Sequence, residues 1–341
     1  MTEVSARSLA LDPDWLPHTF DADGSRLTFV HVPRAQRDAL MFLSEEHFRG
    51  EFPKSTRPVE IIEKELPHAA AAPLHFIFHT AFCASTLLAR AFEIAGVAAT
   101  LREPDVLINL ANRFARNEDR GNRGRLDLVL KLLARPYAPH EAVIVKPTNF
   151  ANRLLLPVME ARPESRAVLL HSDLPTLLRS LAKRGMWGRI WARKLYRSMS
   201  AWTDLTTGFD AGEIFELTDL QVAGLAWLMQ VSHFDRAKRE LGNRALILDS
   251  TDFLANPAMH LQAVARHFGL ALDEAAARAI ADGDVFSRHS KFSQRDYSVE
   301  AREAEHDAAV AAHGEEIDMV VKWVEAVAAH CGVPIRLGSR R

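Results

Sequence analysis

From residue 74 onward, short unbroken runs of apolar residues alternate with longer segments of helical spacing. Each run has the length of a strand and ends in polar or turn residues. Unbroken apolar runs are typical of strands that are buried on both faces. The pattern therefore predicts an α/β domain with a central, mainly parallel sheet flanked by helices. The four runs occupy residues 74–79, 142–145, 167–170 and 245–248.

The first 70 residues follow a different pattern. A strand is predicted over 27–32, a turn over 21–24 and a helix over 34–43. Residues 67–73 are small and unpatterned, which is typical of a connector. The chain is therefore predicted to consist of an N-terminal elaboration, residues 1–70, and an α/β domain, residues 71–341.

Ligands of parallel α/β sheets bind at the carboxyl ends of the strands, so the loops after residues 78, 145 and 170 are where chemistry is expected. The first of these loops joins a strand to a helix, whose N-terminus attracts anions. Ser85 and Thr86 fall at the helix start, where their hydroxyls can either cap the helix or bind a phosphate. The loop has no glycine and no GxxxxGK[ST] pattern, which disfavours a generic ATPase.

Composition narrows the class of protein. The sequence has 42 Lys and Arg against 44 Asp and Glu, a net charge of −2, so the balance does not call for nucleic acid or an anionic membrane as partner. Hydrophobic residues make up 48%, which excludes global disorder. The two cysteines, Cys83 and Cys331, have no metal-ligand spacing and fit a reducing compartment. Without a signal-peptide pattern or an apolar run of ~18 residues, a cytoplasmic protein without a membrane span is expected.

A basic cluster lies in the strongly helical region 176–240. It can hold a phosphate or an acidic acceptor, or form a solvated helix face, which is the favoured interpretation. Its members are Lys183, Arg184, Arg189, Arg193, Lys194 and Arg197.

Residues 82–88 resemble the C-terminal half of the 5′-phosphosulfate loop of the sulfotransferase superfamily, approximately [K/R]-S-G-T/S-T-[L/W]-L. Ser85 and Thr86 match, whereas the family's cation, serine and glycine fall on Phe82, Cys83 and Ala84. The resemblance implies a P-loop-type three-layer fold. It also implies that the sulfuryl donor 3′-phosphoadenosine 5′-phosphosulfate (PAPS) binds to Cys83, Ala84, Ser85 and Thr86.

Two further segments resemble the family's 3′-phosphate sites. Residues 170–180 are similar to R-D-P-x-D-x-x-x-S, so that Ser180 matches and the family arginine falls on Ser172. Residues 287–291 resemble the late loop over the 3′-phosphate, which implies that Arg288 and Lys291 bind there. Residues 249–257 and 265–270 resemble the signature Y-E-D-L-x-x-D-P … F-L-G-L, which identifies the family more than the site.

The resemblance implies transfer of the sulfuryl group from PAPS to a hydroxyl or amine, with release of adenosine 3′,5′-bisphosphate (PAP) and without a metal. Lys146, at a strand end like that of many bacterial members, is expected to neutralise the transferring group. Glu103, in a segment similar to their E-P loop, is the first candidate base; alternatively it is a solvated carboxylate or pairs with Arg102. His79 and His171 are fallback bases that are otherwise structural.

Two other functions stay open. One is a nucleotide-binding pseudoenzyme that keeps the fold but has lost the cations at Phe82 and Ser172. The other is a small-molecule kinase, which the missing P-loop lysine disfavours. No motif specifies the acceptor, the oligomeric state or the role of residues 1–70.

Overall fold

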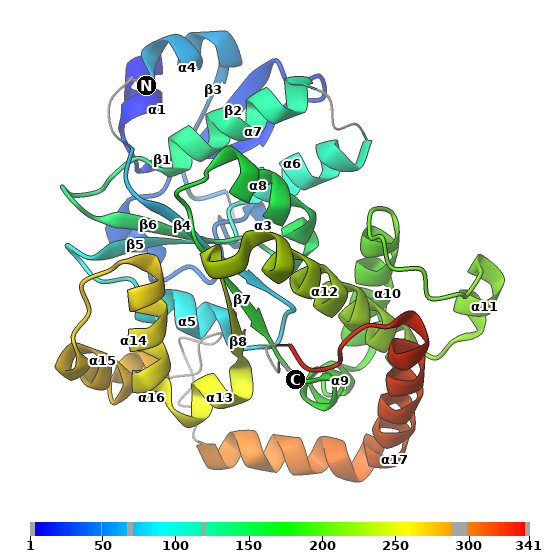
Figure 1. The fold of residues 1–341 in the computed structure, drawn as a ribbon. Coiled ribbons are helices and arrows are strands. Elements are labelled where there is room, and N and C mark those ends of the chain that lie inside the picture. Colours follow the sequence, from blue (N-terminus) through cyan, green and yellow to red (C-terminus); the bar gives the residue numbers. More distant parts are fainter. Residues whose placement is uncertain (1–3, 49, 67–70, 117–119, 288–298, 338–341) are drawn as a thin grey trace. The chain divides into compact units, whose positions relative to one another are not determined.

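The computed structural model describes residues 4–48, 50–66, 71–116, 120–287 and 299–337. Within them lie a three-stranded sheet, β1-β2-β3, and a five-stranded sheet in the order β5-β6-β4-β7-β8 (Figure 1). Strands β4 and β5 both pair in parallel with β6. An α/β fold with a central, mainly parallel sheet flanked by helices is thus confirmed. The five strands are β4 (Leu74–His79), β5 (Ala98–Arg102), β6 (Ala142–Lys146), β7 (Ala167–His171) and β8 (Ala245–Asp249).

The chain divides into two compact units, which are described separately. The first comprises Met1–Phe78, Thr86–Ala167 and Leu261–Ala277, and the second comprises His79–Ser85, Val168–His260 and Arg278–Arg341. The boundary near residue 70 stays a prediction.

The first unit carries the antiparallel sheet, and α6 and α7 pack against β1. The predicted strand 27–32 is β2. The predicted helix 34–43 is shorter in the structure, where α2 ends at Arg37. The carbonyl oxygens of Arg37 and Leu40 accept hydrogen bonds from the Arg102 guanidinium, at 2.5 and 3.1 Å, in place of helical N–H groups. Its elements are α1 (Ala6–Leu11), β1 (Trp15–Phe20), β2 (Arg26–His31), α2 (Arg34–Arg37), α3 (Glu45–Phe48), β3 (Lys54–Pro58), α4 (Val59–Glu65), α6 (Asp105–Arg116), α7 (Arg120–Leu133), η1 (Asn149–Leu154) and α8 (Leu155–Ala161).

Strand β5 was not predicted from the sequence. Its five residues are all buried, but two alanines at its start give little strand signal. A side chain outside the strand anchors it, because the Glu93 carboxylate accepts hydrogen bonds from the backbone N–H and the hydroxyl of Thr100, at 2.7 and 2.8 Å. The register places Arg102 beside Lys146, so β5 and β6 end together.

The second unit is mainly helical. Helix α10 packs against α12, and α9 and α12 pack against α17 (Figure 1). Gly224 brings α12 close to α17, because a Cβ there would lie 2.4 Å from a Val324 methyl. The core includes Leu177, Leu181, Trp227 and Leu228. The helices are α9 (Leu174–Ala182), α10 (Gly185–Ser200), α11 (Ala211–Glu216), α12 (Asp219–Leu241), η2 (Gly242–Arg244), α13 (Ser250–Ala255), α16 (Asp284–Ser287) and α17 (Val299–Cys331).

Three helices have residues in both units: α5 (Ser85–Ala91), α14 (Pro257–Phe268) and α15 (Glu274–Ala281). Helix α14 begins at Pro257, and Gly269, with a φ of 73°, follows its last residue. Helix α5 begins at Ser85 as predicted and ends at Ala91.

The stability of the first unit is expected to depend on pH through His75. This imidazole stacks on Phe268, with ring centroids 4.8 Å apart, and accepts the Arg166 N–H at 3.2 Å. Burial, with the nearby His267 and Arg166, lowers the pKa of His75 from 6.5 to about 4. Below about pH 6.5 the unfolded state therefore binds more protons than the folded state. The contribution of His75 to the free energy of unfolding is complete above that pH and is lost as the pH falls toward 4.

Between pH 7 and pH 5 this group should cost about 2 kcal/mol of unfolding free energy. Urea unfolding at both pH values checks this, and His75→Phe, which keeps an aromatic ring against Phe268, should show a loss smaller by that amount. An unchanged loss in the variant would contradict the assignment.

Candidate functional site

The loop after β4, residues 80–84, has a backbone that non-glycine residues rarely adopt. Ala81, Phe82 and Ala84 have φ values of 74°, 51° and 59°. Each such residue costs on the order of 1–3 kcal/mol, and conformations of this kind persist where the surrounding structure imposes them, often at ligand sites. Successive N–H groups in alternating right- and left-handed conformations can form a concave anion site.

Interactions within the second unit impose this conformation. The N–H of Thr80 donates to the Leu170 carbonyl at 3.1 Å, and the Thr80 carbonyl accepts from the buried Gln230 amide at 3.3 Å. The Cys83 thiol donates to the same Leu170 carbonyl at 3.6 Å. The loop is thus tied to the end of β7 and to α12.

The structure gives the predicted loop residues distinct surroundings. His79 is buried and its Nδ1 accepts the Ala81 N–H at 3.1 Å, so this candidate base helps to hold the loop. Cys83 is buried, with its thiol on the Leu170 carbonyl. Ser85 and Thr86 are buried at the start of α5. Their binding of a nucleotide stays a prediction.

At the end of β7, Ser172 lies against the first residue of the loop. Its N–H donates to the Thr80 hydroxyl at 3.3 Å and its carbonyl accepts the Trp227 indole N–H at 2.9 Å. Within the part of the chain that the structure describes, the Ser172 hydroxyl is fully buried and has no hydrogen-bond partner. A buried hydroxyl in this state costs about 1–3 kcal/mol and calls for a specific explanation, such as a ligand.

His171, one residue earlier, is also buried. Its Nδ1 lies 3.6 Å from the Asp249 carboxylate, and its Nε2 has no hydrogen-bond partner among the described residues. Burial lowers the pKa of His171, while Asp249 opposes the shift. A depressed pKa favours the neutral imidazole at pH 7, so His171 does not replace the cation that the family places at Ser172.

Of the remaining predicted donor-binding residues, Ser180 lies in the described part of the second unit. Asp173 caps α9 by accepting the Thr176 N–H at 2.7 Å, and Ser180 lies later on the same helix, half-buried. Arg288 and Lys291 lie outside the described residues.

In the first unit, the structure brings the two predicted catalytic residues Lys146 and Glu103 into contact. Because β5 and β6 end together, the Glu103 N–H donates to the Lys146 carbonyl at 2.6 Å. The Lys146 ammonium donates to Glu103 Oε1 and forms an ion pair with it. The lysine side chain is 1% exposed and the carboxylate 17%. Glu103 has a φ of 52°, so a strained backbone presents this carboxylate.

A segment of the N-terminal region supports this pair. The Phe42 ring lies 5.1 Å from the Lys146 ammonium. Leu43 donates its N–H to the Arg102 carbonyl at 2.7 Å, and its own carbonyl accepts the Asp105 N–H at 3.2 Å. These two hydrogen bonds hold the backbone before Glu103, at Arg102, and after it, at Asp105. Sequence reasoning missed Phe42, because it placed this residue on a helix face.

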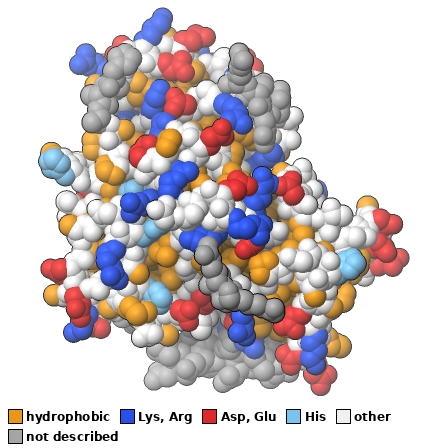
Figure 2. Space-filling model, viewed as in Figure 1, with side chains coloured by type: hydrophobic (Ala, Val, Ile, Leu, Met, Phe, Trp, Pro, Cys, Tyr) orange, Lys and Arg blue, Asp and Glu red, His pale blue; other side chains and the backbone are white. Residues whose placement is uncertain are grey.

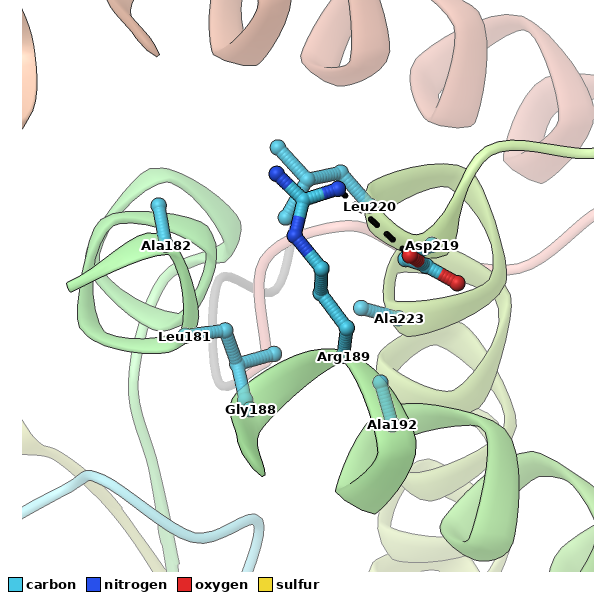
Figure 3. Close-up of a pocket in the computed structure, with 8 residues that line it drawn as sticks. All are labelled: Leu181, Ala182, Gly188, Arg189, Ala192, Asp219, Leu220 and Ala223. Carbon is cyan, nitrogen blue, oxygen red and sulfur yellow. Dashed lines mark hydrogen bonds and ion pairs between the residues drawn. The ribbon is translucent and has the colours of Figure 1, made fainter. Parts of the chain in front are cut away.

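The basic cluster is partly structural. Arg189 and Arg193 of α10 pair with Asp219 of α12, at 3.4 and 2.5 Å. Figure 3 shows Arg189 extending toward Asp219 beside a shallow depression that has no enclosed volume for a small molecule, whose sites typically measure roughly 300–1,000 Å³. These two arginines therefore link two helices. The depression is lined by Leu181, Ala182, Gly188, Arg189, Ala192, Asp219, Leu220 and Ala223.

The described residues contain no group of three or more His, Cys, Asp or Glu placed to hold a metal ion. None of the helices in the described ranges is both long and apolar enough to cross a membrane. On the face drawn in Figure 2, Lys and Arg side chains are interspersed with Asp and Glu.

Comparisons with family models and with curated proteins find no match. Among solved structures, the chain is similar to a sulfotransferase domain from the curacin biosynthetic pathway, with 12% identity over 72% of this chain and 98% of that one, and a TM-score of 0.41. It is also similar to a sulfotransferase from Alicyclobacillus acidocaldarius, with 14% identity over 73% of this chain and 97% of that one, and a TM-score of 0.41. A third similar structure is a sulfotransferase from Mycobacterium tuberculosis, with 14% identity over 62% of this chain and 72% of that one, and a TM-score of 0.40. These three structures are sulfotransferases or sulfotransferase domains.

Proposed function

We propose that the protein is a sulfotransferase that moves a sulfuryl group from PAPS to a hydroxyl or amine of an acceptor. The observation that carries the proposal is the buried Ser172 hydroxyl, which has no hydrogen-bond partner among the described residues and lies next to the strained loop after β4. An anionic ligand that accepts a hydrogen bond from this hydroxyl would satisfy it. Ser85, Thr86 and Ser180 are the further donor-binding side chains proposed in the described part of the chain.

In the proposed reaction, the acceptor oxygen or nitrogen forms a bond to sulfur as the bond from sulfur to the 5′-phosphate oxygen breaks. The electron pair of that bond leaves with PAP, and the acceptor proton must pass to a base. Glu103 is the proposed base and Lys146 the proposed electrostatic stabiliser. The two side chains form an ion pair in the structure, which holds the proposed base and the proposed stabiliser side by side.

Calorimetric titration with PAP, PAPS, adenosine 5′-monophosphate and ATP tests the proposal. PAP is expected to bind at least ~10-fold more tightly than the 5′-monophosphate, because hydrogen bonds to a charged 3′-phosphate each contribute about 1.5–3 kcal/mol. Equal affinities would contradict the proposed site. PAP binding without transfer to a broad panel of acceptors would favour the pseudoenzyme, and preference for ATP would favour the kinase.

Ser172→Ala provides a sharper measurement. Removing a buried hydroxyl that has no hydrogen-bond partner among the described residues should leave the unliganded protein as stable or more stable, while lowering PAP affinity by ~10-fold. Ser165→Ala is the matched control, because the Ser165 hydroxyl is also fully buried without a hydrogen-bond partner among the described residues, yet lies in the first unit. Equal affinities of both variants and the unmodified protein would remove Ser172 from the site.

A further inference from the structure

A bound phosphosulfate needs positive charge close to the loop after β4, and the loop cannot supply it. Residues 80–84 are Thr-Ala-Phe-Cys-Ala, without a lysine or arginine. N–H groups and hydroxyls neutralise an anion less than a guanidinium, whose hydrogen bonds to phosphate are charge-assisted and often bidentate. A cation close to the loop must therefore come from another element.

The structure brings such a cation to the loop at Phe82. The Phe82 ring leaves the strained backbone toward α10 and packs edge-on against Trp191, with centroids 5.2 Å apart. The Arg184 guanidinium lies over the Phe82 ring, 4.9 Å from its centroid, and 5.4 Å from that of Trp187. Two aromatic rings thus hold one guanidinium against the loop.

Arg184 lies in the turn between α9 and α10, just before Gly185, whose φ is 53°. It is exposed to solvent, so an anion can reach it.

We propose that Arg184 supplies the positive charge for the 5′-phosphosulfate of the donor, and that Phe82 positions its guanidinium. The inference rests on the proposed function and names a charged group that its donor site requires. The buried Ser172 hydroxyl independently indicates a ligand at this loop, since Ser172 is hydrogen-bonded to Thr80.

The experiment measures calorimetric affinities for PAP and for adenosine 3′-monophosphate, which lacks the 5′-phosphate. Arg184→Gln should bind PAP about 10- to 100-fold more weakly, the effect of losing a hydrogen bond to a charged group, and bind the 3′-monophosphate within ~2-fold of the unmodified protein. Arg197→Gln, which removes another exposed arginine of α10, is the matched control and should change neither affinity.

A second variant tests the location of the charge. Phe82→Lys, introduced into Arg184→Gln, places a cation in the loop itself and should recover most of the PAP affinity. PAP affinity unchanged by Arg184→Gln, an equal loss for both nucleotides, or no recovery with Phe82→Lys would overturn the inference while leaving the proposed function standing. If the unmodified protein does not bind PAP, the proposed function fails and this inference fails with it.

Discussion

Replacing Lys146 with methionine is expected to lower the free energy of unfolding by about 3 kcal/mol. The lysine is 1% exposed, and its ammonium is paired with a carboxylate that is itself largely shielded from water. Removing one member of such a pair leaves the other charge in a poorly solvated position without its counter-ion. Urea unfolding at pH 7 measures the loss.

The double variant Lys146→Met/Glu103→Gln separates charge from packing. It neutralises the carboxylate, so most of the lost stability should return. Lys131→Met is the matched control, because Lys131 also pairs with a carboxylate, at 2.7 Å, but is 54% exposed. Its loss should stay within about 1 kcal/mol. If the double variant is as unstable as Lys146→Met, the lysine contributes through packing and not through the ion pair.

Glu103→Gln is expected to lower turnover by ~100-fold or more while leaving PAP affinity within ~2-fold, because an amide cannot accept the acceptor's proton. Glutamine keeps an oxygen for the Lys146 ammonium but removes its counter-ion, so this variant should also unfold at lower urea concentration, and rates are compared where it is fully folded. Initial rates are measured with the acceptor identified in the transfer screen.

Glu45→Gln is the control for this variant. Glu45 lies just after Phe42 and Leu43, which support the Lys146–Glu103 pair, but its side chain is 55% exposed and pairs with Lys54. Its turnover should equal that of the unmodified protein. Normal turnover in Glu103→Gln would show that Glu103 is not the base and return attention to His79.

The sequence predicted four of the five central strands, because residues buried on both faces leave unbroken apolar runs. It also placed Lys146 at a strand end and Ser85 at a helix start. The contact between Lys146 and Glu103 was not predicted, because it depends on β5, whose alanines carry little strand signal. Parallel pairing of two strands 44 residues apart is a tertiary property that local patterns do not encode.

The conformation of the loop after β4 could not be predicted from the sequence either. Alanine and phenylalanine rarely adopt a positive φ, so the strain at Ala81, Phe82 and Ala84 comes from hydrogen bonds to distant elements. The same limit applies to Arg184. Its charge was visible in the basic cluster, but its contact with Phe82 follows from the packing of α10.

The contacts of Phe42 and Leu43 bear on how this protein could be divided or recombined. A chain that began at residue 71 would keep Lys146 and Glu103, yet it would lose the ring beside the ammonium and both hydrogen bonds that flank the carboxylate. The strained backbone at Glu103 would then be free to relax. Residues 1–70 therefore contribute contacts that support the Lys146–Glu103 ion pair, and replacing them with another sequence would be expected to alter the orientation of the Glu103 carboxylate.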